Sequence, residues 1–153
     1  MNSLEDTAER SGSLNLAAIV AQIVERMGAP EMLSYGVPRE FWDDFKPSQS
    51  MEIESYTDSL IGGERASPAA FVVCVDYLHS VGMLRIADVL DDLKRVTRGI
   101  GFFQVTTEHA IDGLRTIDQP ALWWLTEFTR RFNLQTYQRI PGGFYVIVYP
   151  RGH

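Results

Sequence analysis

The stretch that decides the fold spans residues 70–79 and reads AFVVCVDYLH. Its apolar part, residues 70–75, is continuous and rich in β-branched side chains, which is typical of a parallel strand covered on both faces. An acidic residue, Asp76, follows directly. Because burying an unpaired carboxylate is costly, we expect the strand to end there, at a sheet edge where Asp76 can hydrogen-bond.

Helices and further strands flank this central strand on both sides. Apolar residues at helical spacing predict helices over residues 14–27, 83–96 and 120–132, and Pro38 could begin a short one over 38–45. Short apolar or alternating runs predict strands at 32–35, 51–56, 102–106, 134–139 and 144–149. Gly99 and Gly101 are expected to bracket the turn into the strand at 102–106. The turn Ile140-Pro141-Gly142-Gly143 is typical of a tight hairpin.

This order of elements predicts the fold class. Helices alternate with strands, and the chain ends in an antiparallel pair, so we expect an α/β three-layer sandwich with a mostly parallel sheet of about six strands. A length of 153 residues suits one domain. We expect a flexible leader over residues 1–13 and a single domain over 14–150.

Composition narrows the functional classes. The net charge of -6 argues against a dedicated binder of nucleic acid or of anionic membranes. Cys74 is the only cysteine and lies in an apolar run, so we expect a buried thiol and no intramolecular disulfide. No apolar run approaches the length of a membrane span, and the first 13 residues do not read as a signal peptide. The cytoplasm is the expected location.

Three places in the chain directly follow predicted strands. In open α/β sheets, ligands bind beyond the carboxyl ends of the strands. The rule selects Tyr35-Gly36, then Thr57-Asp58, and then the segment from Asp76 through Tyr77 and Leu78 to His79. The alternatives stay open at this point: Asp76 could cap a helix or a turn, and Asp58 could be a plain loop acid.

The histidines and tryptophans are further candidates. His79 and His109 each follow a strand and could face one cleft as catalytic residues, or serve as surface or capping residues. No histidine pair has metal-ligand spacing, so we expect no metal site. Trp123 and Trp124 are adjacent on a predicted helix and point about 100° apart, so at most one belongs fully to the core.

A set of motifs in a fixed order resembles the small class I S-adenosylmethionine-dependent methyltransferases. Residues 72–79 (VVCVDYLH) and 89–96 (VLDDLKRV) resemble the fourth strand of that family and the helix after it. The segment GFFQV at 101–105 resembles the fifth strand. Residues 119–125 (QPALWWL) and 141–148 (PGGFYVIV) resemble the closing helix and hairpin of one subgroup. The resemblance covers roughly residues 31 to 150.

The resemblance implies a Rossmann-like methyltransferase fold, S-adenosyl-L-methionine as cofactor and methyl transfer to an acceptor that the sequence does not identify. It implies that Gly36, after Tyr35, forms the glycine turn that approaches the cofactor. It implies that Thr57 or Asp58 supplies the polar group for the ribose hydroxyls. By the same resemblance, the end of the fourth strand, with Asp76, Tyr77 and Leu78, lines the reaction site. Oligomerisation is left open.

The cofactor turn differs from the family pattern. Residues 35–39 read YGVPR and keep one glycine, with Val37 adding bulk and Pro38 lacking an N–H donor. We therefore expect binding of S-adenosylmethionine to be weak, or lost altogether. Two hypotheses follow: an active methyltransferase, or a catalytically inactive protein of this fold that acts as a binding or assembly module.

Overall fold

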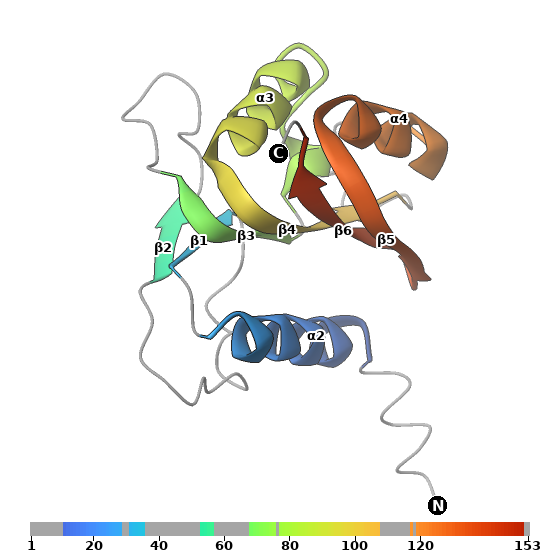
Figure 1. Ribbon diagram of the computed structural model, residues 1–153. Coiled ribbons are helices and arrows are strands. Elements are labelled where there is room, and N and C mark those ends of the chain that lie inside the picture. Colours follow the sequence, from blue (N-terminus) through green and yellow to red (C-terminus); the bar gives the residue numbers. More distant parts are fainter. Residues whose placement is uncertain are drawn as a thin grey trace, which may run out of the picture.

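The computed structural model describes residues 11–28, 31–35, 53–56, 68–75, 77–107, 117 and 119–151. In these residues a six-stranded sheet forms the middle layer, and helices lie on both of its faces (Figure 1). The predicted α/β three-layer arrangement is therefore confirmed. The short helix predicted over residues 38–45 lies outside the described residues.

The strands of the sheet follow the order β2-β1-β3-β4-β6-β5. Four neighbours run parallel: β2 (Ile53–Tyr56), β1 (Met32–Tyr35), β3 (Ala69–Val75) and β4 (Thr97–Thr106). The hairpin strand β6 (Gly143–Pro150) is inserted between β4 and β5 (Phe132–Ile140) and runs antiparallel to both. This pairing confirms the predicted hairpin and the mostly parallel sheet.

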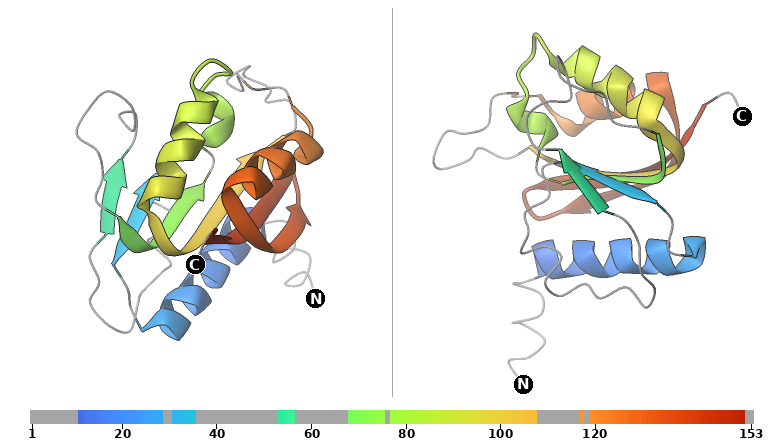
Figure 2. Two further views of the ribbon diagram at one scale, coloured as in Figure 1. Left: turned by 45° about the horizontal axis from the view of Figure 1, so that its top comes forward. Right: turned by 90° about the vertical axis from the view of Figure 1, so that its left-hand side faces the viewer.

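The helices divide between the two faces of the sheet. The helix α2 (Ser11–Met27) covers one face by itself among the described residues, and α3 (Ile86–Val96) and α4 (Ala121–Arg131) cover the other (Figure 2). Side chains alternate along β3, so Phe71 and Val73 pack toward α2 while Val72 and Cys74 pack toward α3 and α4. This alternation explains why the strand reads as a continuous apolar run.

The predicted boundaries of two helices need correction. The helix α2 begins at Ser11, three residues before the predicted start at Leu14. The helix predicted from Met83 begins at Ile86, because a 3-10 helix, η2 (Leu78–Ser80), and a turn come first. Gly82 precedes that turn with a φ of +100°, a conformation that L side chains rarely adopt.

The prediction that Gly99 and Gly101 bracket a turn was wrong, because both lie within β4. A Cβ atom added at Gly99 would stand 2.6 Å from the backbone oxygen of Ala70 on the neighbouring strand. One added at Gly101 would stand 2.7 Å from the ring of Phe103. These glycines therefore allow close packing within the sheet, and they do not break the chain.

Two predictions about buried side chains are confirmed. Trp124 is fully buried in the α3–α4 face of the core, whereas Trp123 only packs against it. Cys74 is fully buried, and burial raises the pKa of its thiol. Among the described residues, no helix is long and apolar enough to cross a membrane.

Candidate functional site at the carboxyl edge of the sheet

The carboxyl ends of the four parallel strands meet at one edge of the sheet. Tyr35, the last residue of β1, stands in register with Tyr56, the last residue of β2, and with Cys74 of β3. One residue further along β3, Val75 stands opposite Gln104 of β4. The chain therefore leaves all four strands within a narrow band, which is where open α/β sheets bind their ligands.

The segment that follows β3 is held tightly against the core. The chain enters η2 shortly after Val75, and Leu78 is completely buried among the side chains of the α3–α4 face. His79 is 9% exposed, and its backbone oxygen accepts a hydrogen bond of 2.9 Å from the N–H of Ile117. This bond joins the end of β3 to the segment that leads into α4.

The turn between β5 and β6 lies at the same edge. The first residue of β6, Gly143, stands opposite Thr106 at the end of β4. The N–H of Thr107 donates to the backbone oxygen of Gly142 at 2.9 Å, and Gln104 Nε2 donates to Thr106 Oγ1 at 3.3 Å. The bond from Thr107 to Gly142 joins the end of β4 to the hairpin, which bounds this part of the edge.

Exposed apolar side chains lie at the starts of α3 and α4, and both helices begin on the carboxyl side of the sheet. Leu84, in the turn before α3, is 97% exposed, and Met83 beside it is 48% exposed. Leu122, in the first turn of α4, is 73% exposed. We call these three side chains the apolar rim. Apolar surface of this kind is available to an apolar ligand or a partner protein.

The structure describes four of the nine predicted site residues. Tyr35 ends β1, Tyr77 is half-buried at the start of η2, and Leu78 and His79 follow as described above. The other five, Gly36, Thr57, Asp58, Asp76 and His109, lie outside the described residues. Their convergence on one cleft therefore stays a prediction. Among the described residues, no group of three His, Cys, Asp or Glu side chains is arranged to hold a metal ion.

Ile117 was not singled out from the sequence. It lies in a segment, residues 107–119, that has no regular apolar periodicity. Its side chain is nevertheless buried, and its N–H makes the long-range hydrogen bond to His79. No local pattern signals a contact between residues 38 positions apart, so only the tertiary structure could identify this residue.

The sheet is mostly parallel, and its antiparallel strand β6 is inserted between β4 and β5. This arrangement defines a Rossmann-like fold, and comparison with solved structures identifies the type of Rossmann-like fold. The chain has the fold of the class I S-adenosylmethionine-dependent methyltransferases, as the resemblance predicted. No protein-family model matches the sequence, and no curated protein matches it.

Three solved structures illustrate the likeness. The DhpI–SAH complex has a TM-score of 0.64 and 15% identity, over 99% of this chain and 93% of that one. The N-methyltransferase NodS from Bradyrhizobium japonicum WM9, in complex with S-adenosyl-L-homocysteine, has a TM-score of 0.60 and 9% identity, over 90% and 87%. The 1,6-didemethyltoxoflavin-N1-methyltransferase of Burkholderia thailandensis has a TM-score of 0.60 and 12% identity, over 97% and 82%. Its structure contains 1,6-didemethyltoxoflavin and S-adenosylhomocysteine.

Proposed function

We propose that this protein binds S-adenosylmethionine at the carboxyl edge of the sheet and transfers its methyl group to an acceptor. The observation that carries the proposal is the register of Tyr35, Tyr56 and Cys74, which aligns the ends of three parallel strands in a fold shared with proteins solved with S-adenosylhomocysteine. Ligands of open α/β sheets occupy this position.

The residues that follow these strands have the chemical groups that a ligand such as S-adenosylmethionine requires. Gly36 comes directly after Tyr35 and offers backbone without a side chain, which a closely approaching ligand needs. Thr57 and Asp58 come directly after Tyr56 and offer oxygen atoms that can accept hydrogen bonds from ribose hydroxyls. We propose these residues as the cofactor-binding set on the β1 and β2 side of the edge.

On the β3 side, we propose that Asp76 and Tyr77 line the reaction site. Tyr77 is half-buried and packs partly against the core at this edge. The side chain of Leu78 is completely buried in the core. We therefore assign to Leu78 a contact through its backbone only.

S-adenosylmethionine supplies an activated methyl group when it is bound, so the task of the protein is to hold the acceptor in line and to exclude water. For an acceptor that must lose a proton, His79 and His109 are the candidate bases. The His79 side chain is almost completely buried, so it would act on an acceptor that reaches past the surface of η2.

The alternative function is a catalytically inactive binding or assembly module. Two observations favour it: the turn at residues 36–39 keeps one glycine, and Leu84 and Leu122 of the apolar rim are strongly exposed. A protein partner could cover such side chains.

Calorimetric titration of the whole protein with S-adenosylmethionine and S-adenosylhomocysteine tests the proposal. We expect both to bind, and we expect Asp58→Asn to weaken binding at least about tenfold through loss of a charge-assisted hydrogen bond. Glu25→Gln is the matched control, because Glu25 lies exposed on α2 and should leave binding unchanged. A wild-type protein that binds neither compound would overturn the methyltransferase proposal and favour the module.

A further inference from the structure

The strand β5 has one unpaired side, at the outer edge of the sheet. It pairs only with β6 among the described residues, and Figure 1 shows it at one end of the sheet. The strand has nine residues, whereas β2 at the opposite edge has four. An unpaired strand edge presents a row of N–H and C=O groups with which another chain can pair.

The edge of β5 carries few of the features that prevent such pairing. Proteins protect long edge strands with charged side chains, a proline or an irregular ladder. The sequence of β5 is FNLQTYQRI, which contains one charged residue, Arg139, and no proline. Its ladder to β6 shifts register between Leu134 and Thr136, but residues 136–140 pair with β6 without interruption. The edge formed by residues 136–140 is therefore regular enough to accept a partner strand.

The hydrogen bonds around the hairpin show which backbone groups of β5 face β6. The N–H of Thr107 donates to the backbone oxygen of Gly142. This bond joins the residues that flank the pair Thr106 and Gly143, so that pair exchanges no hydrogen bonds of its own. The backbone groups of Gly143 therefore point away from β4 and toward Ile140, its partner on β5. Because the direction alternates along a strand, every second residue of β5 counted back from Ile140 faces β6.

The residues between them, Tyr137 and Arg139, direct their N–H and C=O groups outward. The backbone oxygen of Arg139 accepts a 3.0 Å hydrogen bond from Nε2 of Gln138, a side chain and not a neighbouring strand. Arg139 pairs with Phe144, whose side chain belongs to the α3–α4 side of the core. Tyr137 lies on the same side, with its ring centroid 5.5 Å from that of Phe144. Both outward-facing residues therefore have their side chains on the α3–α4 face of the sheet.

We propose that β5 pairs with β5 of a second copy of this chain, antiparallel and about a two-fold axis at Gln138, so that the two sheets join into one. We call the two paired β5 edges the seam. In this register, Tyr137 of each copy exchanges backbone hydrogen bonds with Arg139 of the other. Every outward backbone group of these two residues thereby gains a partner. The association does not depend on whether the protein transfers methyl groups.

The side chains favour this register and a second copy as the partner. Residues at equal distances from the axis stand opposite each other, so each Arg139 guanidinium stands opposite a Tyr137 ring, an attractive pair of cation and aromatic face. An axis at Arg139 would instead place two guanidinium groups opposite each other, which is destabilising. An axis at Tyr137 would bring the interrupted ladder at residues 134–136 into the seam. On the α2 face, the two Gln138 amides meet at the axis, where each can donate to the other. The edge is thus complementary to itself.

Disulfide cross-linking of the whole protein tests the register. Residues that stand opposite each other at a two-fold axis lie within disulfide distance, so the Gln138→Cys variant should form a covalent dimer under mild oxidation. Asn133→Cys is the matched control, because Asn133 is exposed on the same strand but lies far from the axis, and it should stay monomeric on a non-reducing gel. The native thiol of Cys74 is fully buried and should not react. Equal cross-linking of the two variants would overturn the proposal.

Sedimentation equilibrium of the whole protein tests the association itself. We expect the wild type to dimerise at submillimolar concentration and Tyr137→Arg to weaken the dimer about tenfold or more, because it sets like charges opposite each other at both ends of the seam. Adding Arg139→Glu to that variant should restore the dimer by pairing opposite charges, which a folding defect would not allow. Tyr149→Arg is the matched control, because Tyr149 on β6 is 38% exposed, close to the 37% of Tyr137, and lies outside the seam. A wild type that stays monomeric would overturn the proposal, and so would a dimer that Tyr137→Arg leaves unchanged.

Discussion

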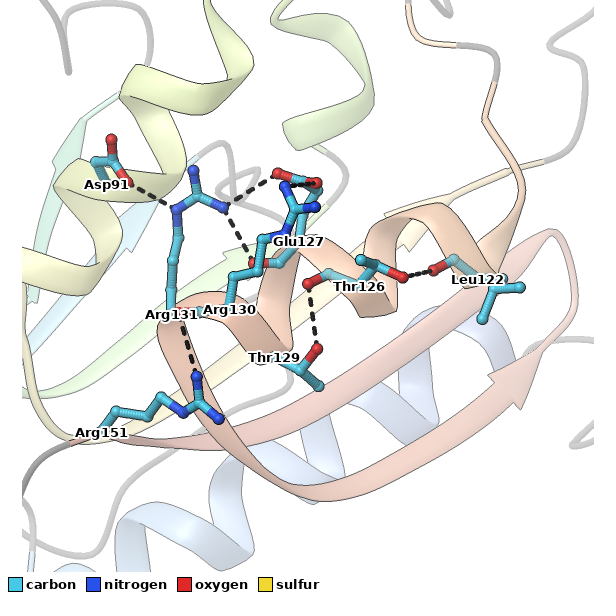
Figure 3. A network of polar contacts seen from close by, with 8 residues as sticks. All are labelled: Asp91, Leu122, Thr126, Glu127, Thr129, Arg130, Arg131 and Arg151. Carbon is cyan, nitrogen blue, oxygen red and sulfur yellow. Dashed lines mark hydrogen bonds and ion pairs between the residues drawn. The ribbon is translucent and has the colours of Figure 1, made fainter.

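The Arg131 guanidinium donates from Nε to Oδ1 of Asp91 at 2.7 Å and thereby joins the last turn of α4 to α3 (Figure 3). From Nη1 the same group donates to Glu127, at 3.0 Å to its backbone oxygen and at 3.2 Å to Oε1. Arg130 pairs with the other carboxylate oxygen of Glu127 at 3.1 Å. The two helices on this face of the sheet are thus connected by a charged network outside their apolar contact.

Arg131→Met should destabilise the fold more than Asp91→Asn does. The side chains of Arg131 and Glu127 are only 12% and 15% exposed, so removing the arginine leaves a poorly solvated carboxylate without this partner. The side chain of Asp91 is 65% exposed and readily solvated. We expect about 1–3 kcal/mol for Arg131→Met and under about 1 kcal/mol for Asp91→Asn in urea unfolding. Equal effects would show that the Glu127 contacts contribute little.

Gly99→Ala should destabilise the sheet although it removes no contact. The new methyl group would meet the backbone oxygen of Ala70 at 2.6 Å, and neither strand can move away without breaking its ladder. We expect a loss of about 1–3 kcal/mol in urea unfolding. Gly28→Ala is the comparison, because space around Gly28 is open and only its φ of +78° opposes a side chain. Its cost should be about 1 kcal/mol. If Gly99→Ala left the free energy of unfolding unchanged, this result would contradict the close packing of the two strands.

The buried thiol of Cys74 should make stability depend on alkaline pH. Complete burial raises the pKa of this thiol far above its ordinary value of 9.0, so the folded protein keeps the proton that the unfolded chain releases. The contribution of Cys74 is fully present below about pH 9 and declines above it by up to about 1.4 kcal/mol per pH unit. Urea unfolding between pH 7 and 10.5 measures this decline. Cys74→Ala should lack it, and an identical profile for the variant would disprove the assignment.

Trp124→Phe should be far milder than Trp124→Ala. The indole N–H is buried and has no hydrogen-bond acceptor among the described residues. Replacement by phenylalanine therefore reduces the buried area of the ring but breaks no hydrogen bond. We expect about 1–2 kcal/mol for phenylalanine and about 3–5 kcal/mol for alanine, which also leaves a cavity beside Phe128. A phenylalanine variant as unstable as the alanine variant would mean that the N–H holds a hydrogen bond in solution.

Restoring glycines in the turn after β1 should tighten cofactor binding. Val37 and Arg39 follow Gly36, where the resemblance implies that bare backbone approaches S-adenosylmethionine. Each lost hydrogen bond costs about 0.5–1.5 kcal/mol, so two defects would weaken binding up to about a hundredfold. The double variant Val37→Gly, Arg39→Gly should recover part of this loss in calorimetry. A wild type that already binds in the nanomolar range would contradict the expectation.

The strands were predictable where the sequence pattern depends on burial alone. The run at 70–75 reads as a strand covered on both faces because its side chains alternate between two apolar layers. The hairpin at 140–143 was predictable because a turn needs glycine, and Gly142 has a φ of +84°. Helix boundaries were less accurate. The segment between β3 and α3 has no strong local signal of a turn apart from Gly82.

The candidate site was predictable as an edge of the sheet and only partly as a set of residues. The strand-end rule selected Tyr35 and Tyr77 because parallel strands bring their carboxyl ends together. The same rule could not show that the side chain of Leu78 would be buried in the core, or that the N–H of Ile117 would donate a hydrogen bond to the backbone oxygen of His79. Both outcomes depend on how helices far along the chain pack against η2.

The sequence by itself determined the order of the elements and the apolar surfaces that drive them together, because periodicity and turn chemistry are local properties of the chain. Only the tertiary structure decided that Gly99 and Gly101 belong to a strand and that Arg131 of α4 pairs with Asp91 of α3. The physical reason is that these properties arise between segments distant in sequence. The free space around a Cβ atom, or the charge near a guanidinium, is set by whichever neighbours folding brings there.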